Sequence, residues 1–116
     1  MTHTGSCHCG GIKYEADVDL KTALECNCSL CYKRGAPLTF MPKADLRLLT
    51  PDANASTYTF NKHAIRHRFC ANCGVHVFGE ATDPKSGEAM VALNLRTIDG
   101  LDLESLQVHH YDGRSV

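Results

Sequence analysis

The sequence predicts a small all-β domain that depends on bound metal. Apolar and polar residues alternate over many short segments, glycine and proline separate these segments, and the chain has no long amphipathic helical pattern. All seven cysteines gather in three tight clusters instead of being spread as small core residues. With 116 residues and 43% hydrophobic content, we expect one domain, residues 1–116, whose modest core gains from a metal.

Short segments along the chain carry the alternating or β-branched pattern of a strand. They are residues 12–16, 20–24, 37–41, 46–48, 56–60, 65–69, 75–78, 89–95 and 108–111. The segment 12–16 follows Gly10-Gly11, so we expect the first cysteines in a turn that opens a strand. The pattern at 56–60 is the strongest, because nearly every residue there is β-branched or aromatic.

Turns and single helical turns are expected between these strands. Residues 29–34 predict one helical turn, which Gly35 is expected to end. Pro42 suits the first position of a second such turn. The other turns or loops are expected at 51–54, 61–63, 82–87 and 102–106.

The cysteine spacing is typical of metal ligands. The clusters read C-x-C at 7–9, C-x-C-x-x-C at 26–31 and C-x-x-C at 70–73. Gaps of one or two residues let one loop supply two or three ligands, and all-sulfur tetrahedral sites belong mostly to zinc or iron. Seven thiolates make one closed four-cysteine site with three left over, which suggests a structural zinc and a catalytic zinc with an open position. Spacing alone does not decide which four belong together.

Composition excludes some classes of function. The net charge of −1 argues against a general nucleic-acid binder, and no apolar run is long enough to span a bilayer. Residues 1–5 lack the basic and apolar regions of a signal peptide. We therefore expect a cytoplasmic location, where thiols stay reduced and free for metal. A disulfide framework is the weaker alternative, since the cysteine count is odd.

Three strings in this order now resemble a known family. They are Gly5-Ser6-Cys7-His8-Cys9-Gly10, Cys26-Asn27-Cys28-Ser29-Leu30-Cys31 and Phe69-Cys70-Ala71-Asn72-Cys73-Gly74. The set closely resembles the glutathione-dependent formaldehyde-activating enzyme family, which includes centromere protein V-like domains. The segments 93–96, 98–100 and 111–114 look like the closing segments of that family, so the resemblance spans nearly the whole chain. It implies a small β-tent fold of short antiparallel strands with few or no helices.

The resemblance also implies a grouping of the cysteines. Cys7, Cys9, Cys70 and Cys73 align with the family's structural zinc site. Cys26, Cys28 and Cys31 align with its second, catalytic zinc. One position departs from the family pattern, because Asn27 stands where a histidine is common. That position is not a ligand in the family, so we expect metal binding to be retained.

The implied activity is that of a carbon–sulfur lyase similar to S-(hydroxymethyl)glutathione synthase. Glutathione, or another small thiol, would bind the open metal position as thiolate and add to formaldehyde or another aldehyde. His8, His63 and His67 are the candidates for the proton donor. Two groups of cations are candidates to attract the glutathione carboxylates, or are simply solvated surface charges. They are Lys33 and Arg34, or Lys62, Arg66 and Arg68.

Two alternatives stay open. The cysteines at 26–31 are candidates for a second structural zinc completed by a local histidine. The whole chain is also a candidate for a zinc-stabilised binding module without turnover, as the centromere-associated relatives suggest. The three cysteines left over after a closed site favour the enzyme.

Overall fold

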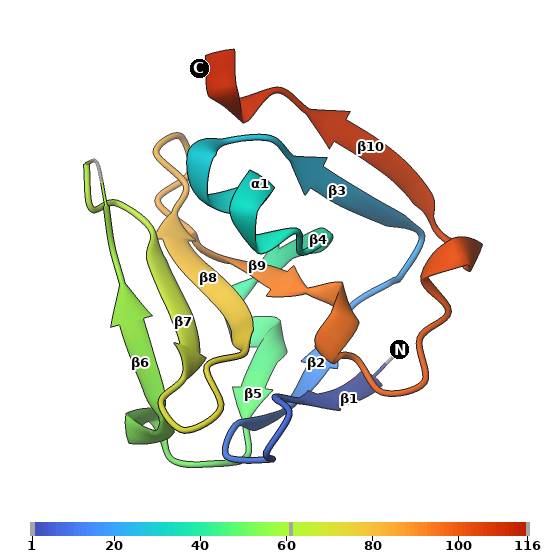
Figure 1. Cartoon of the computed structure of the whole chain (residues 1–116), viewed down its shortest axis with the longest axis vertical. Helices are drawn as coiled ribbons and strands as arrows, with labels where there is room; N and C mark the ends of the chain where they lie inside the picture. The colour runs from blue at the N-terminus through green and yellow to red at the C-terminus, as the bar shows by residue number, and fades with distance from the viewer. Residues whose placement is uncertain (1, 61, 116) are drawn as a thin grey trace.

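A computed structural model describes residues 2–60 and 62–115, and these residues form two β-sheets (Figure 1). The smaller sheet has the strand order β1-β2-β5, and the larger has the order β10-β3-β4-β9-β8-β7-β6. The smaller sheet contains β1 (Thr2–Ser6), β2 (Lys13–Asp17) and β5 (Leu46–Leu48). The larger contains β3 (Thr22–Cys26), β4 (Leu38–Pro42), β6 (Ala55–Tyr58), β7 (Arg66–Cys70), β8 (His76–Thr82), β9 (Ala89–Asn94) and β10 (Gln107–Tyr111).

Helical structure is confined to short pieces in the described ranges. Cys28 caps the single α-helix, α1 (Ser29–Arg34), by accepting from the backbone N–H of Cys31. Gly35 ends it in the left-handed region at φ 70°, as predicted. The 3₁₀ turns are η1 (Lys43–Asp45), η2 (Asp52–Asn54), η3 (Leu95–Thr97), η4 (Leu103–Ser105) and η5 (Gly113–Ser115). None of the helices in the described part of the chain has the length and apolar character needed to cross a bilayer.

The predicted all-β class is confirmed, with one difference at an edge. Every strand pair is antiparallel except β10 and β3, which run parallel. The chain between β9 and β10 spans residues 95–106 and crosses the end of the molecule before it returns. This connection brings β10 back to the sheet beside β3 and in the same direction. A crossover to a parallel strand needs about a dozen residues, which is more than a hairpin turn has. The expectation of antiparallel strands alone was therefore wrong for this pair.

The core lies between the two sheets. Ile12, just before β2, and Tyr14 of β2 belong to one buried cluster with Val91 and Leu93 of β9. All four are almost fully buried. The Tyr14 hydroxyl pairs with Thr97 Oγ1 at 2.7 Å, so its burial leaves no unpaired polar atom. Burial raises the pKa of Tyr14 to about 12. Gly5 has no room for a side chain, because a Cβ there would collide with the Tyr14 hydroxyl and the Thr97 carbonyl.

The strand β1 was not predicted, and its sequence explains why. Thr2–Ser6 contains no alternating apolar residue, and the strand is held through backbone pairing with β2. The expected strand at 56–60 ends earlier, at Tyr58. The expected hairpin turn at 61–63 includes Asn61, which lies outside the described residues, while His63 adopts a left-handed conformation with φ 55°.

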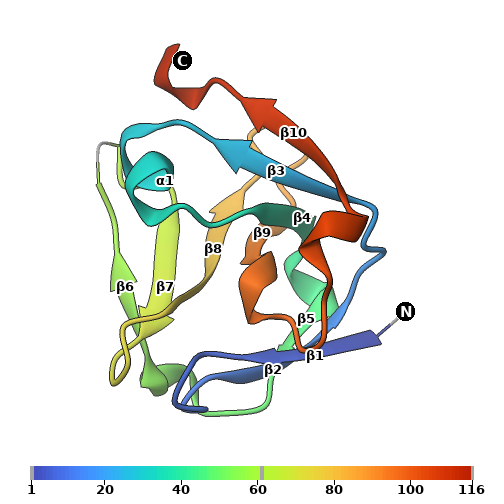
Figure 2. The same ribbon diagram turned by 45° about the vertical axis from the view of Figure 1, so that its right-hand side comes forward.

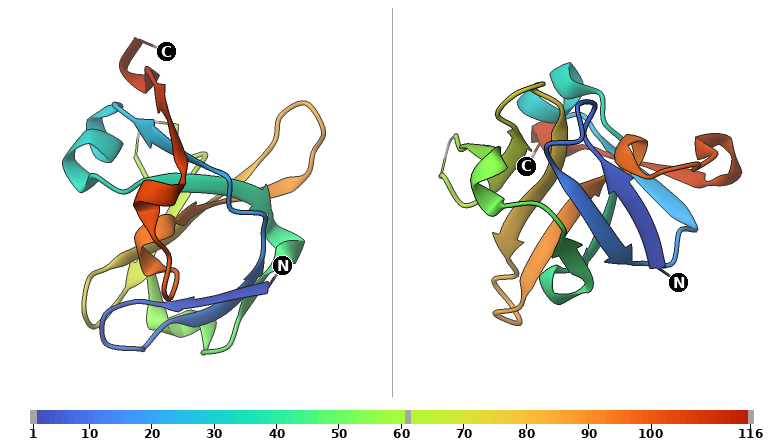
Figure 3. Two further views of the ribbon diagram at one scale, coloured as in Figure 1. Left: turned by 90° about the vertical axis from the view of Figure 1, so that its right-hand side faces the viewer. Right: turned by 90° about the horizontal axis from the view of Figure 1, so that it is seen from below.

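The element that carries the central cysteines lies far from the small sheet. Figures 1 and 2 place α1 and the C-terminal segment at the end of the molecule opposite β1 and β2. The turned views in Figure 3 agree with this arrangement. The large sheet thus has one face on the core and offers its other face, beside α1, for a site.

Candidate metal centres and active site

The first cysteine cluster joins two loops that are distant in the sequence. Cys7 and Cys9 follow β1, Cys70 ends β7, and Cys73 lies in the turn before β8. Their four Sγ atoms lie within 4.8 Å of one another. The Cys7–Cys9 and Cys9–Cys70 sulfur distances are 3.8 and 3.5 Å. Tetrahedral zinc with sulfur at about 2.3 Å requires sulfurs about 3.8 Å apart, so the four thiols fit that ion.

Backbone N–H groups surround these sulfurs. Gly11 and Ile12 donate to Cys9 and Cys7 at 3.4 and 3.3 Å, respectively. Backbone N–H groups of Val75 and Cys9 lower the pKa of Cys73 to about 6. Donors aimed at sulfur favour the thiolate over the thiol, and the thiolate is the form that binds metal.

The second cluster forms where β3 runs into α1. Cys26 ends β3, Cys28 is the N-cap of α1, and Cys31 lies in the helix. Their three Sγ atoms also lie within 4.8 Å of one another, and no described histidine or carboxylate joins the group. Burial, the hydrogen bond with Cys28 and the nearby Cys26 charge raise the pKa of Cys31 to about 12. A bound dication would relieve this crowding of thiolates.

All seven cysteines, each within the described ranges, are free thiols. Each cluster is able to hold a metal ion, and an all-sulfur donor set is consistent with zinc. The second cluster offers three ligands where the first offers four. Among the described residues, no histidine lies close enough to be the fourth ligand that a second structural zinc would need.

A cavity of about 730 Å³ adjoins the second cluster. It lies between the large sheet, α1 and the C-terminal segment. Its lining is mainly apolar and contains two arginines but, among the described residues, no Asp or Glu. The lining residues are Leu24, Cys26, Cys28, Ser29, Cys31, Arg34, Leu38, Phe40, Phe60, Ile65, His67, His76, Gly79, Ala92, Tyr111, Gly113 and Arg114.

The sheet side of this cavity is one row of cross-strand neighbours. Phe40 pairs with Ala92, Ala92 with Gly79, and Gly79 with His67, across β4, β9, β8 and β7. Directly paired residues present their side chains on the same face of a sheet. Two small residues, Gly79 and Ala92, therefore form a hollow between the larger side chains of Phe40 and His67.

Arg34 connects the second cluster to this row. Its Nη2 donates to Cys31 Sγ at 3.4 Å, and its Nη1 lies 3.4 Å from His67 Nδ1. Burial and the Arg34 charge lower the pKa of His67. Burial also lowers the pKa of His76 to about 3. The lowered pKa values favour the neutral form of both rings, whose centres lie 6.2 Å apart.

Several polar atoms beside the cavity are buried without a partner. They are His67 Nε2, Arg34 Nε and both ring nitrogens of His76. An unpaired buried polar group costs about 1–3 kcal/mol, so such groups cluster where a ligand or a proton transfer requires them.

The C-terminal segment closes one side of the cavity and is fastened by Asn27. The Asn27 side chain donates to Asp112 at 2.9 Å and accepts from the backbone N–H of Arg114 at 3.0 Å. Gly113 then passes so close to the cluster that an added Cβ would lie 2.6 Å from Cys26 Sγ. Asn27 thus holds the C-terminal segment against the cysteine loop.

The predicted proton donors and cations are sorted by this geometry. His67 and Arg34 line the cavity, whereas His8, His63, Lys33 and Lys62 do not. The sequence analysis missed His76 and Arg114. The alternating pattern after Cys73 places His76 in a strand, and Arg114 lies within a segment that already resembled the family, but neither signal indicated a cavity.

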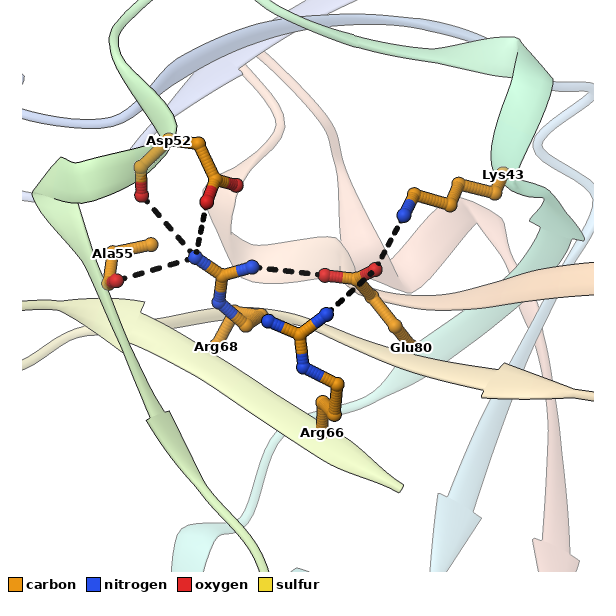
Figure 4. A network of polar contacts seen from close by, with 6 residues as sticks. All are labelled: Lys43, Asp52, Ala55, Arg66, Arg68 and Glu80. Carbon is orange, nitrogen blue, oxygen red and sulfur yellow. Dashed lines mark hydrogen bonds and ion pairs between the residues drawn. The ribbon is translucent and has the colours of Figure 1, made fainter. Parts of the chain in front are cut away.

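Arg66 and Arg68 belong to a different part of the molecule (Figure 4). Arg68 is only 3% exposed and donates to Glu80 at 3.0 Å and to Asp52 at 3.2 Å. Glu80 also accepts from Lys43 at 2.7 Å, and Arg66 lies 3.9 Å from it. Both arginines therefore contact carboxylates on the face of β7 and β8 opposite to His67 and Gly79, and neither lines the cavity beside the cysteines.

The fold and the two clusters define a small all-β domain with two sites able to bind metal. Residues 2–112 match the model of the glutathione-dependent formaldehyde-activating enzyme family, and the chain belongs to that family. A solved structure described as a Rhodobacter sphaeroides protein is similar, with a TM-score of 0.74 and 26% identity. The similarity covers 94% of this chain and 100% of the other.

Proposed function

We propose that the chain is a zinc enzyme of the carbon–sulfur lyase type that acts on the adduct of a small thiol and an aldehyde. Glutathione is the proposed thiol, as in S-(hydroxymethyl)glutathione synthase. The observation that carries the proposal is the three-cysteine cluster at the edge of a large cavity. Three protein ligands leave room for a fourth from the substrate, which a closed four-cysteine site does not. The cytoplasm is the proposed compartment, because thiols stay reduced there.

The four-cysteine cluster is proposed as the structural zinc site. It joins residues 61 positions apart, Cys9 and Cys70. Crosslinking such a long loop removes conformational freedom from the unfolded chain, so metal binding there adds to folding free energy. Cys7 and Cys70 are buried, which also suits a site that does not exchange ligands.

The proposed reaction is an addition that needs no oxidant or reductant. The thiol sulfur forms a bond to the aldehyde carbon, the carbonyl π pair moves to oxygen, and the proton lost by the thiol ends on that oxygen. The reverse breaks the carbon–sulfur bond and is the lyase direction. Zinc held by Cys26, Cys28 and Cys31 would supply a positive centre that stabilises the substrate sulfur as thiolate.

The chain's own residues supply orientation and the proton. Arg34 places a positive charge beside Cys31 Sγ and holds His67 through Nδ1. His67 Nε2, whose hydrogen has no acceptor in the protein because Arg34 donates to Nδ1, is the proposed general acid toward the adduct oxygen. Arg114, on the C-terminal segment, also lines the cavity, and its guanidinium lies 5.1 Å from the centre of the Tyr32 ring. It is proposed to attract a glutathione carboxylate.

Exchange NMR between free glutathione, formaldehyde and S-(hydroxymethyl)glutathione tests this function. The zinc-loaded protein is expected to accelerate exchange, and His67→Gln to reduce the acceleration by about 100-fold, the lower range for general acid–base groups. His63→Gln is the matched control, because His63 is an exposed histidine that contacts Thr59 at 2.7 Å outside the cavity. Exchange at the uncatalysed rate with fully loaded protein would overturn the proposal.

A further inference from the structure

The hollow beside the three cysteines is more apolar than the formaldehyde adduct requires. That adduct brings only one carbon and a hydroxyl to the thiol sulfur. The cavity measures about 730 Å³, and its sheet side presents Phe40, Ala92, Gly79 and the neighbouring Ile65. A hydroxymethyl group leaves this surface uncovered.

The apolar side chains at the hollow are exposed in the protein alone. Phe40 is 53% exposed and Ile65 is 46% exposed. Leu24 of β3 pairs with the buried Leu38 of β4, and both also line the cavity. Exposed apolar surface that lines a concave site next to reactive groups is typical of a ligand pocket.

The position of the small residues is specific. Gly79 lies in the middle of a strand without a positive φ, so backbone conformation does not require glycine. A Cβ at Gly79 would sit 3.5 Å from Ile65 and 3.7 Å from His67, at ordinary contact distance. A Cβ is therefore sterically allowed at Gly79. Because glycine has none, the hollow stays open beside Ala92.

The two cations of the lining lie away from Phe40. Arg114 lies on the C-terminal segment and Arg34 lies beside His67, whereas Phe40 and Ala92 form the apolar end of the row on the sheet. A thiol with carboxylates suits the cationic side. The apolar side then faces whatever group the aldehyde contributes to the adduct.

We infer that the aldehyde partner carries an apolar group of aromatic or branched aliphatic size, which binds over Gly79 and Ala92 between Phe40 and Ile65. This inference rests on the proposed function and names its substrate class. The reaction is the same balanced addition of a thiol to an aldehyde, with the hydrogen of formaldehyde replaced by the apolar group.

Binding of two thiols to zinc-loaded protein tests the hollow without turnover. The probes are 2-phenylethanethiol and 2-mercaptoethanol, which differ by a phenyl ring in place of a hydroxyl, and the readout is the dissociation constant from calorimetry. Burial of one aromatic ring predicts that the phenyl compound binds about tenfold or more tightly. Ala92→Leu fills the hollow and should remove most of that advantage while changing the 2-mercaptoethanol affinity less than about twofold.

Ala89→Leu is the matched control, because it makes the same change in the same strand at an exposed position outside the cavity lining. Phe40→Ser removes an exposed apolar side chain of the hollow and should weaken the binding of the phenyl compound. It keeps the test valid if Ala92→Leu folds poorly. With glutathione, the kcat/KM for phenylacetaldehyde should exceed that for formaldehyde by about tenfold.

The outcomes separate the two proposals. Equal affinities for both thiols, with no effect of Ala92→Leu or Phe40→Ser, would overturn the apolar subsite and leave thiol chemistry standing. If neither thiol binds the zinc-loaded protein, the proposed function is overturned, and the inference with it.

Discussion

Replacing Glu80 by glutamine should destabilise the fold through the buried Arg68. The Arg68 guanidinium is 3% exposed, and Glu80 is its less exposed carboxylate partner, at 3.0 Å. Glutamine keeps the shape and a hydrogen-bond acceptor but removes the charge. Leaving a buried charge without its partner costs about 3–5 kcal/mol.

The structure moves the expected value to the lower limit of that range or just below it. Arg68 Nη2 also donates to the Asp52 carboxylate and to the Asp52 and Ala55 carbonyls, each at 3.2 Å. These acceptors remain in Glu80→Gln, so we expect a loss of about 2–3 kcal/mol in the free energy of unfolding. The matched control is Asp52→Asn. Its carboxylate is 71% exposed, so its removal should cost about 1 kcal/mol or less.

Urea unfolding of zinc-loaded protein, followed by circular dichroism, measures both variants. The metal must be saturating in every sample, since metal binding to the native state contributes to apparent stability. Equal effects of Glu80→Gln and Asp52→Asn would refute the reasoning, because burial would then not decide the energy of the pair.

Three further predictions concern other contacts. Gly5→Ala should prevent folding or lower the free energy of urea unfolding by more than about 2 kcal/mol, because its Cβ would collide with the Tyr14 hydroxyl and the Thr97 carbonyl. The control, Gly87→Ala, lies at an open position and should show only the cost of its positive φ. Hydrogen bonds from Arg47 and Thr2 lower the pKa of Asp17 to about 2. The contribution of Asp17 to stability is therefore present above its unfolded pKa of about 4 and is lost as the pH falls toward about 2. Arg47→Gln should raise the midpoint of the Asp17 carboxyl in an NMR titration, and an unchanged midpoint would contradict the contact. Gly113→Ala should weaken metal binding at the three-cysteine cluster by about tenfold or more, because its Cβ would lie 2.6 Å from Cys26 Sγ, and should leave the four-cysteine cluster unchanged. Equal loss of both metals in a chelator competition would count against that placement of Gly113.

Local patterns in the sequence predict much of this fold. Alternation located most strands, and Gly35 marked the end of α1 because it supplies the left-handed conformation there. β1 was missed because Thr2–Ser6 has no apolar alternation, and its pairing depends on β2. The parallel pair β10–β3 depends on a long-range return of the chain, which no local pattern records.

The candidate site divides in the same way. Cysteine spacing indicated metal ligands, but the grouping of Cys7 and Cys9 with Cys70 and Cys73 came from the resemblance to the family, because these ligands come from two loops that are distant in the sequence. The cavity was not predictable, because its row joins Phe40, Ala92, Gly79 and His67 from four strands. Its small residues look unremarkable in the sequence, and only the register of β7, β8 and β9 brings them together. Arg68 was expected to be either a cation for the glutathione carboxylates or a solvated surface charge, and it is neither, since it is buried against Glu80 on the next strand.

The central claim is an open metal site at Cys26, Cys28 and Cys31. Metal content with zinc X-ray absorption tests it most directly, on the native chain and on Cys28→Ser, with and without glutathione. We predict two zincs per native chain with about 3.5 sulfur ligands on average, rising to about 4 with glutathione. Cys28→Ser should retain one zinc with about four sulfurs and no response to glutathione. One zinc in the native chain, unaffected by Cys28→Ser or glutathione, would contradict the claim.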